Sequence, residues 1–260
     1  MTQQTPALAQ SGNNPVLNHE AFGKAASAAG VAGGTMTVLR TYAITVVLLI
    51  LLVAGAAVGW SQVEVRDLGN SSVATMPAWV WLATLGVFVL AIITAVNPGA
   101  APITAPTYAL VEGAVLGVVS KFFDLDYEGI VLQAVGATVA VFAVMLLLYA
   151  SRIVRATPRL VVGVIAAMGG LMLLYFVAWI TWLFGVDVRF WDDPSPVGVA
   201  LAVGVVVLGA LTLPIHFDFI ERASEARYPS SLAWYGAYGL MLSLIWIYLS
   251  ILRVLAILRR

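Results

Sequence analysis

Residues 79–113, WVWLATLGVFVLAIITAVNPGAAPITAPTYALVEG, contain the features that decide the fold. They hold a long apolar segment, the tripeptide Asn97-Pro98-Gly99 in its middle, and one acid, Glu112, near its end. The uncharged run to which they belong extends from residue 68 to 111, roughly twice the 20 or so residues that one membrane helix needs. Because Asn-Pro-Gly favours a turn, the sequence predicts two helices joined by a tight hairpin.

Five further uncharged runs, at residues 41–63, 129–151, 160–186, 194–217 and 228–252, are each long enough to cross a bilayer. Hydrophobic residues make up 62% of the chain and charged residues only 10%, whereas a soluble domain carries roughly 25% charged residues. The sequence therefore predicts an all-α polytopic membrane protein, a seven-helix bundle embedded in the lipid bilayer. We expect its spans near residues 38–60, 78–96, 104–122, 130–150, 160–184, 197–217 and 233–256.

The same composition argues against several other classes of protein. The formal net charge is zero, so we expect no nucleic-acid partner. The chain has no cysteine and only two histidines, which leaves no thiolate or histidine-based metal site, and we assign no metal site or cofactor. No P-loop, HExxH or Gly-x-Ser-x-Gly motif occurs, and we therefore expect that the protein is not an enzyme.

Residues 1–36 are mostly polar or small and predict a disordered tail, followed by a membrane domain over residues 37–260. Basic residues favour a cytoplasmic N-terminus, because the inner segments would then hold most of them. These are Lys24, Arg40, Arg152, Arg155, Arg159, Arg222 and Arg227, against Arg66, Lys121 and Arg189 outside. Seven crossings place Arg259 and Arg260 outside, so the alternative is a last segment that re-enters the membrane. We favour seven crossings, because residues 228–252 carry no charge.

Glu112 is the one charge deep inside an apolar segment. Tyr108, Glu112 and Ser120 are four or eight residues apart and share one helical face, beside a strip of small residues at Ala109, Gly113 and Gly117. Glu112 could face a hydrated interior and bind a cation or a proton. It could equally be a protonated acid that is hydrogen-bonded to a neighbouring helix and only holds the bundle together.

The sixth predicted span ends in Pro214, His216 and Asp218. Pro214 frees a backbone carbonyl and is expected to bend the helix. Asp218 has two interpretations, an ion pair with Arg222 at a solvated helix end, or a gating carboxylate that faces the bundle. His216 is more typical of a satisfied histidine near the interface than of a ligand.

The seventh predicted span carries a stripe of residues at three- and four-residue steps: Gly239, Ser243, Trp246, Ser250 and Arg253. Such a stripe of small and polar residues favours packing against several helices, so we place this span near the middle of the bundle. Arg253 either extends to the interface or pairs with an interior acid. Gln133 in the fourth span also needs a polar partner.

Several stretches together resemble one known family. They are Tyr108–Gly117 (YALVEGAVLG), Gly129–Val135 (GIVLQAV), Leu148-Tyr149, Phe217–Glu221 (FDFIE) and Trp246–Leu255 (WIYLSILRVL), with Asn14-Pro15-Val16 in the tail. In this order and spacing the chain resembles a bacterial branch of the Bax inhibitor-1 family, also called the transmembrane Bax inhibitor motif family. The resemblance covers nearly the whole chain from about residue 14 onward.

The resemblance implies seven spans with the last surrounded by the other six, and a pH-sensitive calcium leak. It also implies two aspartates that share a proton near the cytoplasmic mouth. Asp218 matches the first, but the second falls near Ser243, and Ser250 stands where this branch often has a glutamate. Our hypothesis is therefore that Glu112 and Asp218 supply the acidic path. Counter-charge would come from Arg40, Arg222 or Arg253, with support from the polar residues Tyr108, Ser243, Ser250 and Gln133.

The predicted function is thus a pH-sensitive, calcium-type cation leak channel in a bacterial inner membrane, with calcium as the transported ion. The alternative is a non-transporting regulator that binds another membrane protein, such as a quality-control protease or stress machinery. A proton-coupled carrier is disfavoured, because no internal repeat is evident.

Overall fold

The computed structural model describes residues 34–67, 72–185 and 194–260. In these ranges seven helices are long and apolar enough to cross a membrane. They are α2 (Val38–Ser61), α3 (Trp79–Val96), α4 (Ala101–Asp126), α5 (Ile130–Ala150), α6 (Pro158–Leu183), α7 (Pro196–Glu225) and α8 (Leu232–Leu258). The predicted all-α seven-helix membrane bundle is confirmed.

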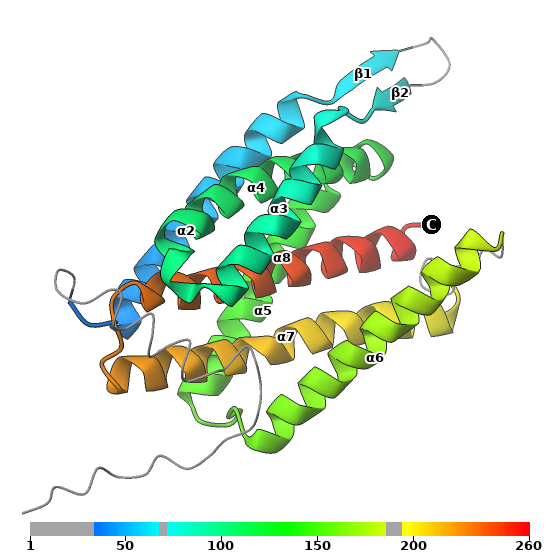
Figure 1. Cartoon of the computed structure of the whole chain (residues 1–260). Helices are drawn as coiled ribbons and strands as arrows, with labels where there is room; N and C mark the ends of the chain where they lie inside the picture. The colour runs from blue at the N-terminus through cyan, green and yellow to red at the C-terminus, as the bar shows by residue number, and fades with distance from the viewer. Residues whose placement is uncertain (1–33, 68–71, 186–193) are drawn as a thin grey trace, which may run out of the picture.

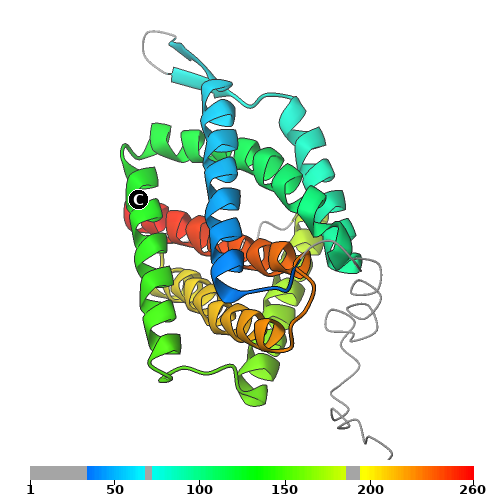
Figure 2. The same cartoon turned by 90° about the vertical axis from the view of Figure 1, so that its left-hand side faces the viewer.

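The last helix lies at the centre of the bundle, as predicted. Helix α8 packs against α7, α2, α5 and α4, and its buried residues extend over its whole length, from Leu232 to Ile257. Figures 1 and 2 show α8 crossing the middle of the molecule, with α7 on one side and α2 and α4 on the other. The large side chains of α8 fill the space between its neighbours, and this contact forms the main apolar core.

The predicted hairpin between the second and third spans is also present. Helix α3 ends at Val96, a short 3-10 turn, η2 (Pro98–Ala100), follows, and α4 begins at once. A hydrogen bond of 2.7 Å between the hydroxyls of Thr94 and Thr104 joins the two helices just beyond the turn. Pro106 lies inside α4 rather than in the hairpin, so α4 begins three residues earlier than predicted.

Helices α2 and α4 approach closely through four glycines. Gly55 and Gly59 of α2 lie against the backbone of α4, and Gly113 and Gly117 of α4 lie against the backbone of α2. A Cβ atom at any of the four would overlap a carbonyl oxygen of the opposite helix. The predicted small-residue strip on α4 therefore serves the contact with α2, as in other small-xxx-small pairs of membrane helices.

Helix α7 is longer than predicted. It continues through Pro214 to Glu225, whereas the sequence predicted an end near residue 217, and that boundary is wrong by eight residues. Hydropathy marks where a segment becomes polar, but a helix can continue beyond that point when its polar residues stabilise the helical conformation. Asp218 and Arg222 form an i,i+4 ion pair of this kind. Asp218 consequently lies inside α7.

Two helices end in the same way, with an arginine in the left-handed conformation. Arg152 (φ 61°) follows α5 and Arg227 (φ 53°) follows α7. In each case the amide of the arginine and the amide that follows it bond back to the last turn, for example Arg227 N–H to Ser224 C=O at 3.1 Å and Tyr228 N–H to Ala223 C=O at 3.0 Å. This is the Schellman pattern, in which glycine is the usual residue.

A short antiparallel hairpin, β1 (Glu64–Asp67) and β2 (Ser72–Thr75), connects α2 to α3, with Glu64 opposite Thr75. This hairpin was not predicted from the sequence. A small apolar cluster of Val63, Val80 and Val118 lies where this connection meets α3 and α4. Figure 1 shows the hairpin projecting from one end of the bundle.

The two ends of the described chain lie at opposite ends of the bundle (Figure 1). Met36 is 1% exposed, and its amide donates to the Tyr228 carbonyl at 2.7 Å, next to a bridge between Thr35 and Pro229. The last three residues of the predicted tail thus contact the α7–α8 connection, while residues 1–33 lie outside the described ranges.

At the other end of the bundle, Arg259 donates to the Glu128 carbonyl at 3.0 Å and to the Gln133 side chain at 2.8 Å. This contact gives Gln133 the polar partner that its place in the fourth span required. It also holds the C-terminus against the α4–α5 connection. The 27-residue length of α8 supports a complete crossing rather than a re-entrant segment.

The glycine contact between α2 and α4 can be tested with two matched alanine substitutions. Gly117→Ala places a methyl group on the Ala56 carbonyl, whereas Gly86→Ala in α3 meets nothing within 4 Å. Overpacking of this kind costs about 1–3 kcal/mol. We expect thermal unfolding in detergent to occur at a clearly lower temperature for Gly117→Ala and at an unchanged or higher one for Gly86→Ala. Equal melting temperatures would contradict the close crossing.

Candidate functional site

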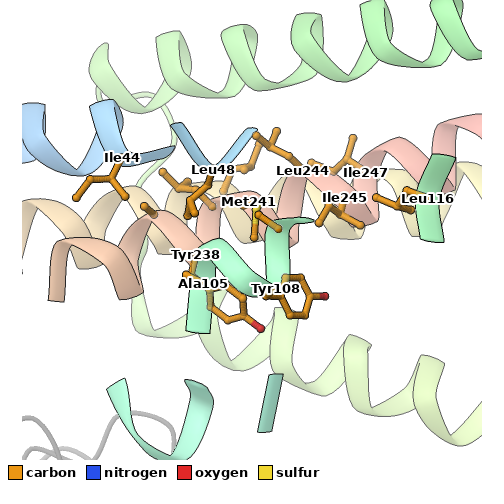
Figure 3. Close-up of a cluster of buried hydrophobic side chains, with 14 of the residues drawn as sticks. Ile44, Leu48, Ala105, Tyr108, Leu116, Tyr238, Met241, Leu244, Ile245 and Ile247 are labelled. Atoms are coloured by element: carbon orange, nitrogen blue, oxygen red, sulfur yellow. The ribbon is translucent and has the colours of Figure 1, made fainter. Parts of the chain in front are cut away.

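Glu112 lies near the middle of α4 and is partly buried, between Tyr108 and Ser120, which both contact α8. Tyr108 is one helical turn before it, and the ring of Tyr108 meets the ring of Tyr238 from α8 edge to face, with centroids 5.1 Å apart. Figure 3 shows these two tyrosines side by side at the margin of the apolar cluster. Glu112 is close enough to both tyrosines to interact with them electrostatically.

Two polar groups at this place have no protein partner. Within the described ranges, the Glu112 carboxyl group makes no hydrogen bond or ion pair. The Tyr238 hydroxyl is buried and also has no hydrogen-bond partner, in a side chain that is 3% exposed. Unsatisfied polar groups are costly at membrane depth. The structure therefore does not supply the helix partner that a purely structural Glu112 would need.

A second group of polar residues lies at the C-terminal end of α7, near the start of α2. Arg222 pairs with Asp218 at 2.7 Å, and the side chains are 72% and 26% exposed, respectively. One turn from Asp218, Glu221 accepts a hydrogen bond of 2.5 Å from the Tyr149 hydroxyl of α5. The solvated ion pair predicted for Asp218 is thus the arrangement seen, and a second carboxylate lies beside it.

Aromatic rings close the bundle directly beneath this group. Phe217 is 1% exposed and meets Tyr42 of α2, Phe142 of α5 and Tyr149 of α5, with ring centroids 6.5, 5.8 and 5.5 Å away. The acids at the C-terminal end of α7 are therefore separated from the bundle interior by a packed aromatic layer.

The position expected for a second aspartate holds a neutral pair instead. Ser243 of α8 is 2.8 Å from the Thr212 hydroxyl of α7, which also donates to the Gly209 carbonyl. Thr212 precedes Asp218 by six residues, or about 9 Å along the helix. Asp218 therefore has no titratable partner at Ser243, and its charged partner is Arg222.

The predicted stripe on α8 faces a cavity of about 1110 Å³ rather than several packed helices. All five residues of the stripe line it, together with parts of α3, α6 and α7. His216 lies in its wall, so close to Gly239 that a Cβ there would come within 2.8 Å of the imidazole. Arg253 donates to the Tyr175 hydroxyl of α6 across the cavity at 3.3 Å.

The structure brings some predicted site residues together and separates others. Tyr108 lies beside Glu112, while Arg40 is exposed at the start of α2 and Gln133 lies at the far end of the bundle. Of the three predicted counter-charges, Arg222 is the one paired with Asp218 among the described residues, and none pairs with Glu112. In those residues no group of three potential metal ligands occurs.

The sequence analysis overlooked Tyr149, Glu221 and Tyr238 as site residues. The contact between Tyr149 and Glu221 spans 72 residues, so no local spacing indicates it. Tyr238 was visible only as the residue before Gly239 in the stripe, and a single tyrosine in an apolar span is ordinary. Its unsatisfied hydroxyl is a property of the packed bundle alone.

Seven helices that are long and apolar enough to cross a membrane, with the last of them packed against α2, α4, α5 and α7, define a polytopic membrane protein. The profile of the family described as "Bax inhibitor 1 like" matches residues 14–260, and the chain belongs to this family. A search of curated proteins found no match.

The ion pair of Asp218 and Arg222 should contribute little to stability, because exposed pairs contribute about 0.2–1 kcal/mol. We expect Asp218→Asn and Arg222→Gln to change the free energy of unfolding only slightly, with a coupling energy below about 1 kcal/mol in the double variant. Denaturant titration of the four proteins measures it. A coupling above about 2 kcal/mol would show that the pair is effectively buried.

Proposed function

We propose that this protein conducts cations passively across a bacterial inner membrane, with its N-terminus in the cytoplasm, and that protonation of acidic side chains controls the flux. Calcium is the cation we favour. Glu112 would bind the passing ion at mid-depth, and Asp218 and Glu221 would receive it at the inner mouth. The protein would act without a cofactor and without catalysis.

The observation that carries this proposal is the unpartnered Glu112. An acid inside a membrane span usually serves transport or proton transfer, and the competing structural role requires a hydrogen-bond partner that the described residues do not provide. The buried Tyr238 hydroxyl, also without a partner, lies on the same side of α4. Water or a cation at this place would satisfy both groups.

The inner end of α7 supports the same chemistry. Asp218 and Glu221 lie three residues apart on one helix, and carboxylate oxygens are the ligands that a hard cation such as Ca²⁺ prefers. Arg222 and Tyr149 occupy these carboxylates in the present arrangement. A cation that enters here must therefore displace Arg222 or Tyr149 and pass the aromatic layer around Phe217, which makes this conformation a closed one.

The proposal predicts that flux depends on pH through Glu112. Calcium entry into dye-loaded proteoliposomes should rise from pH 5 to pH 8 in the wild type, because an ionised carboxylate binds a cation and a protonated one does not. Glu112→Gln should remove most of this dependence. It should also lower the flux at pH 8 by about ten- to a hundredfold, which corresponds to losing one contact with a charged group of about 1.5–3 kcal/mol.

Asp218→Asn should alter the pH profile of the flux as well. The matched control is Glu225→Gln, because Glu225 is an exposed acid in the last turn of α7, and this variant should leave the pH profile unchanged. An unchanged profile in both Glu112→Gln and Asp218→Asn would refute the acidic path. No flux at any pH from folded wild-type protein would favour the alternative function, a regulator that binds another membrane protein.

A further inference from the structure

The cavity beside α8 is a large space inside the membrane-spanning region. Tyr108 and Tyr238 form part of its wall, but none of the acids of the proposed cation path, Glu112, Asp218 and Glu221, lines it. Its α8 wall extends from Tyr235 to Arg253, about 27 Å at 1.5 Å per residue. This length along α8 is comparable to the hydrocarbon core of a bilayer, which is about 30 Å thick. Its volume of about 1110 Å³ is above the range of most small-molecule pockets.

The cavity is formed because α6 stands away from the rest of the bundle. Among the described helices α6 packs chiefly against α7, and only Val164 and Ala178 of its residues are buried. The opposite wall comes from α3, through Ala91, Ile92 and Ala95. Figure 1 shows α6 splayed from the bundle and passing in front of α7. The side of the cavity between α3 and α6 therefore faces the acyl chains of the bilayer.

The walls are mostly apolar, with one charged residue at one end. Among the described residues that line the cavity, Arg253 is the only one with a charged side chain, and it contacts Tyr175 of α6. Ser250 lies three residues earlier on the same stripe. Helix α8 ends at Leu258, five residues or about 7.5 Å beyond Arg253, so Arg253 lies near one end of this membrane-spanning helix.

We propose that this cavity binds an anionic phospholipid, with its phosphate at Arg253 and one acyl chain along the α8 stripe. A guanidinium offers five donors in a planar fork that suits a phosphate, and it can hold Tyr175 and a phosphate together. The acyl chain of one leaflet reaches about 15 Å, which is shorter than the cavity. Charge complementarity at one end and apolar walls along the rest match the two parts of a lipid.

Native mass spectrometry of the full-length protein in detergent tests this proposal, with titration of dioleoyl phosphatidylglycerol against dioleoyl phosphatidylcholine. We expect one phosphatidylglycerol to bind at least fivefold more tightly than phosphatidylcholine. A basic residue near an anionic lipid contributes about 1 kcal/mol, which corresponds to roughly fivefold in affinity. Arg253→Gln should remove this preference for phosphatidylglycerol. Lys121 is a basic residue that stacks on Trp60 outside the cavity, so Lys121→Gln should keep the preference.

A second pair of variants tests the position of the acyl chain. Ala95→Trp fills the cavity from an exposed position on α3, whereas Val96→Trp adds the same side chain to a neighbouring residue that is 75% exposed and outside the lining. We expect Ala95→Trp to weaken phosphatidylglycerol binding and Val96→Trp to leave it unchanged. Both substitutions start from exposed residues, so neither should prevent folding.

Four outcomes would overturn the proposal. Equal binding of both lipids, unaffected by Arg253→Gln, would exclude an anionic headgroup site. Equal effects of the two tryptophan variants would exclude the cavity as the place of the acyl chain. Competition by millimolar inorganic phosphate, with no dependence on the acyl chain, would identify free phosphate as the occupant. Dimers in place of lipid adducts would identify a second copy of the chain as the occupant.

Discussion

The close crossing of α2 and α4 determines how the rest of the bundle is arranged. Four glycines bring the two backbones into contact, and no side chain separates the helices there. Once Gly113 and Gly117 face α2, helical geometry turns Tyr108, Glu112 and Ser120 toward α8. The hydrogen bond of 2.6 Å between Ser120 and Tyr248 then fixes α8 against α4. The place of Glu112 in the bundle therefore follows from residues that have no chemical function of their own.

Most other polar residues inside the bundle are paired across two helices. Thr94 with Thr104, Ser120 with Tyr248, and Thr212 with Ser243 each join two spans, and Arg253 joins α8 to α6 through Tyr175. In a bilayer such bonds replace the water that a soluble protein would use. Against this background Glu112 and Tyr238 differ, because among the described residues they have no such partner.

The sequence predicts the spans, the Asn97 hairpin and the central last helix, because each depends on local hydropathy, turn chemistry or helical spacing. It does not predict the extension of α7 to Glu225, since apolar length reports membrane thickness and not where a helix ends. The contact of Tyr149 with Glu221 depends on how distant helices meet. The stripe on α8 was recognised, but its orientation toward a cavity depends on the position of α6, which no spacing within α8 encodes.

Arg152 and Arg227 have a consequence for the biosynthesis of the protein. Each occupies a left-handed cap where glycine would avoid a backbone cost of about 1 kcal/mol. Both turns lie at the end of the bundle where α2 begins, and positive charge in short loops opposes their translocation across a membrane. With the N-terminus in the cytoplasm, as proposed, a residue that is locally unfavourable in the finished fold would keep its loop on the cytoplasmic side during insertion. Part of the stability of the mature bundle would then be given up for the orientation of its helices.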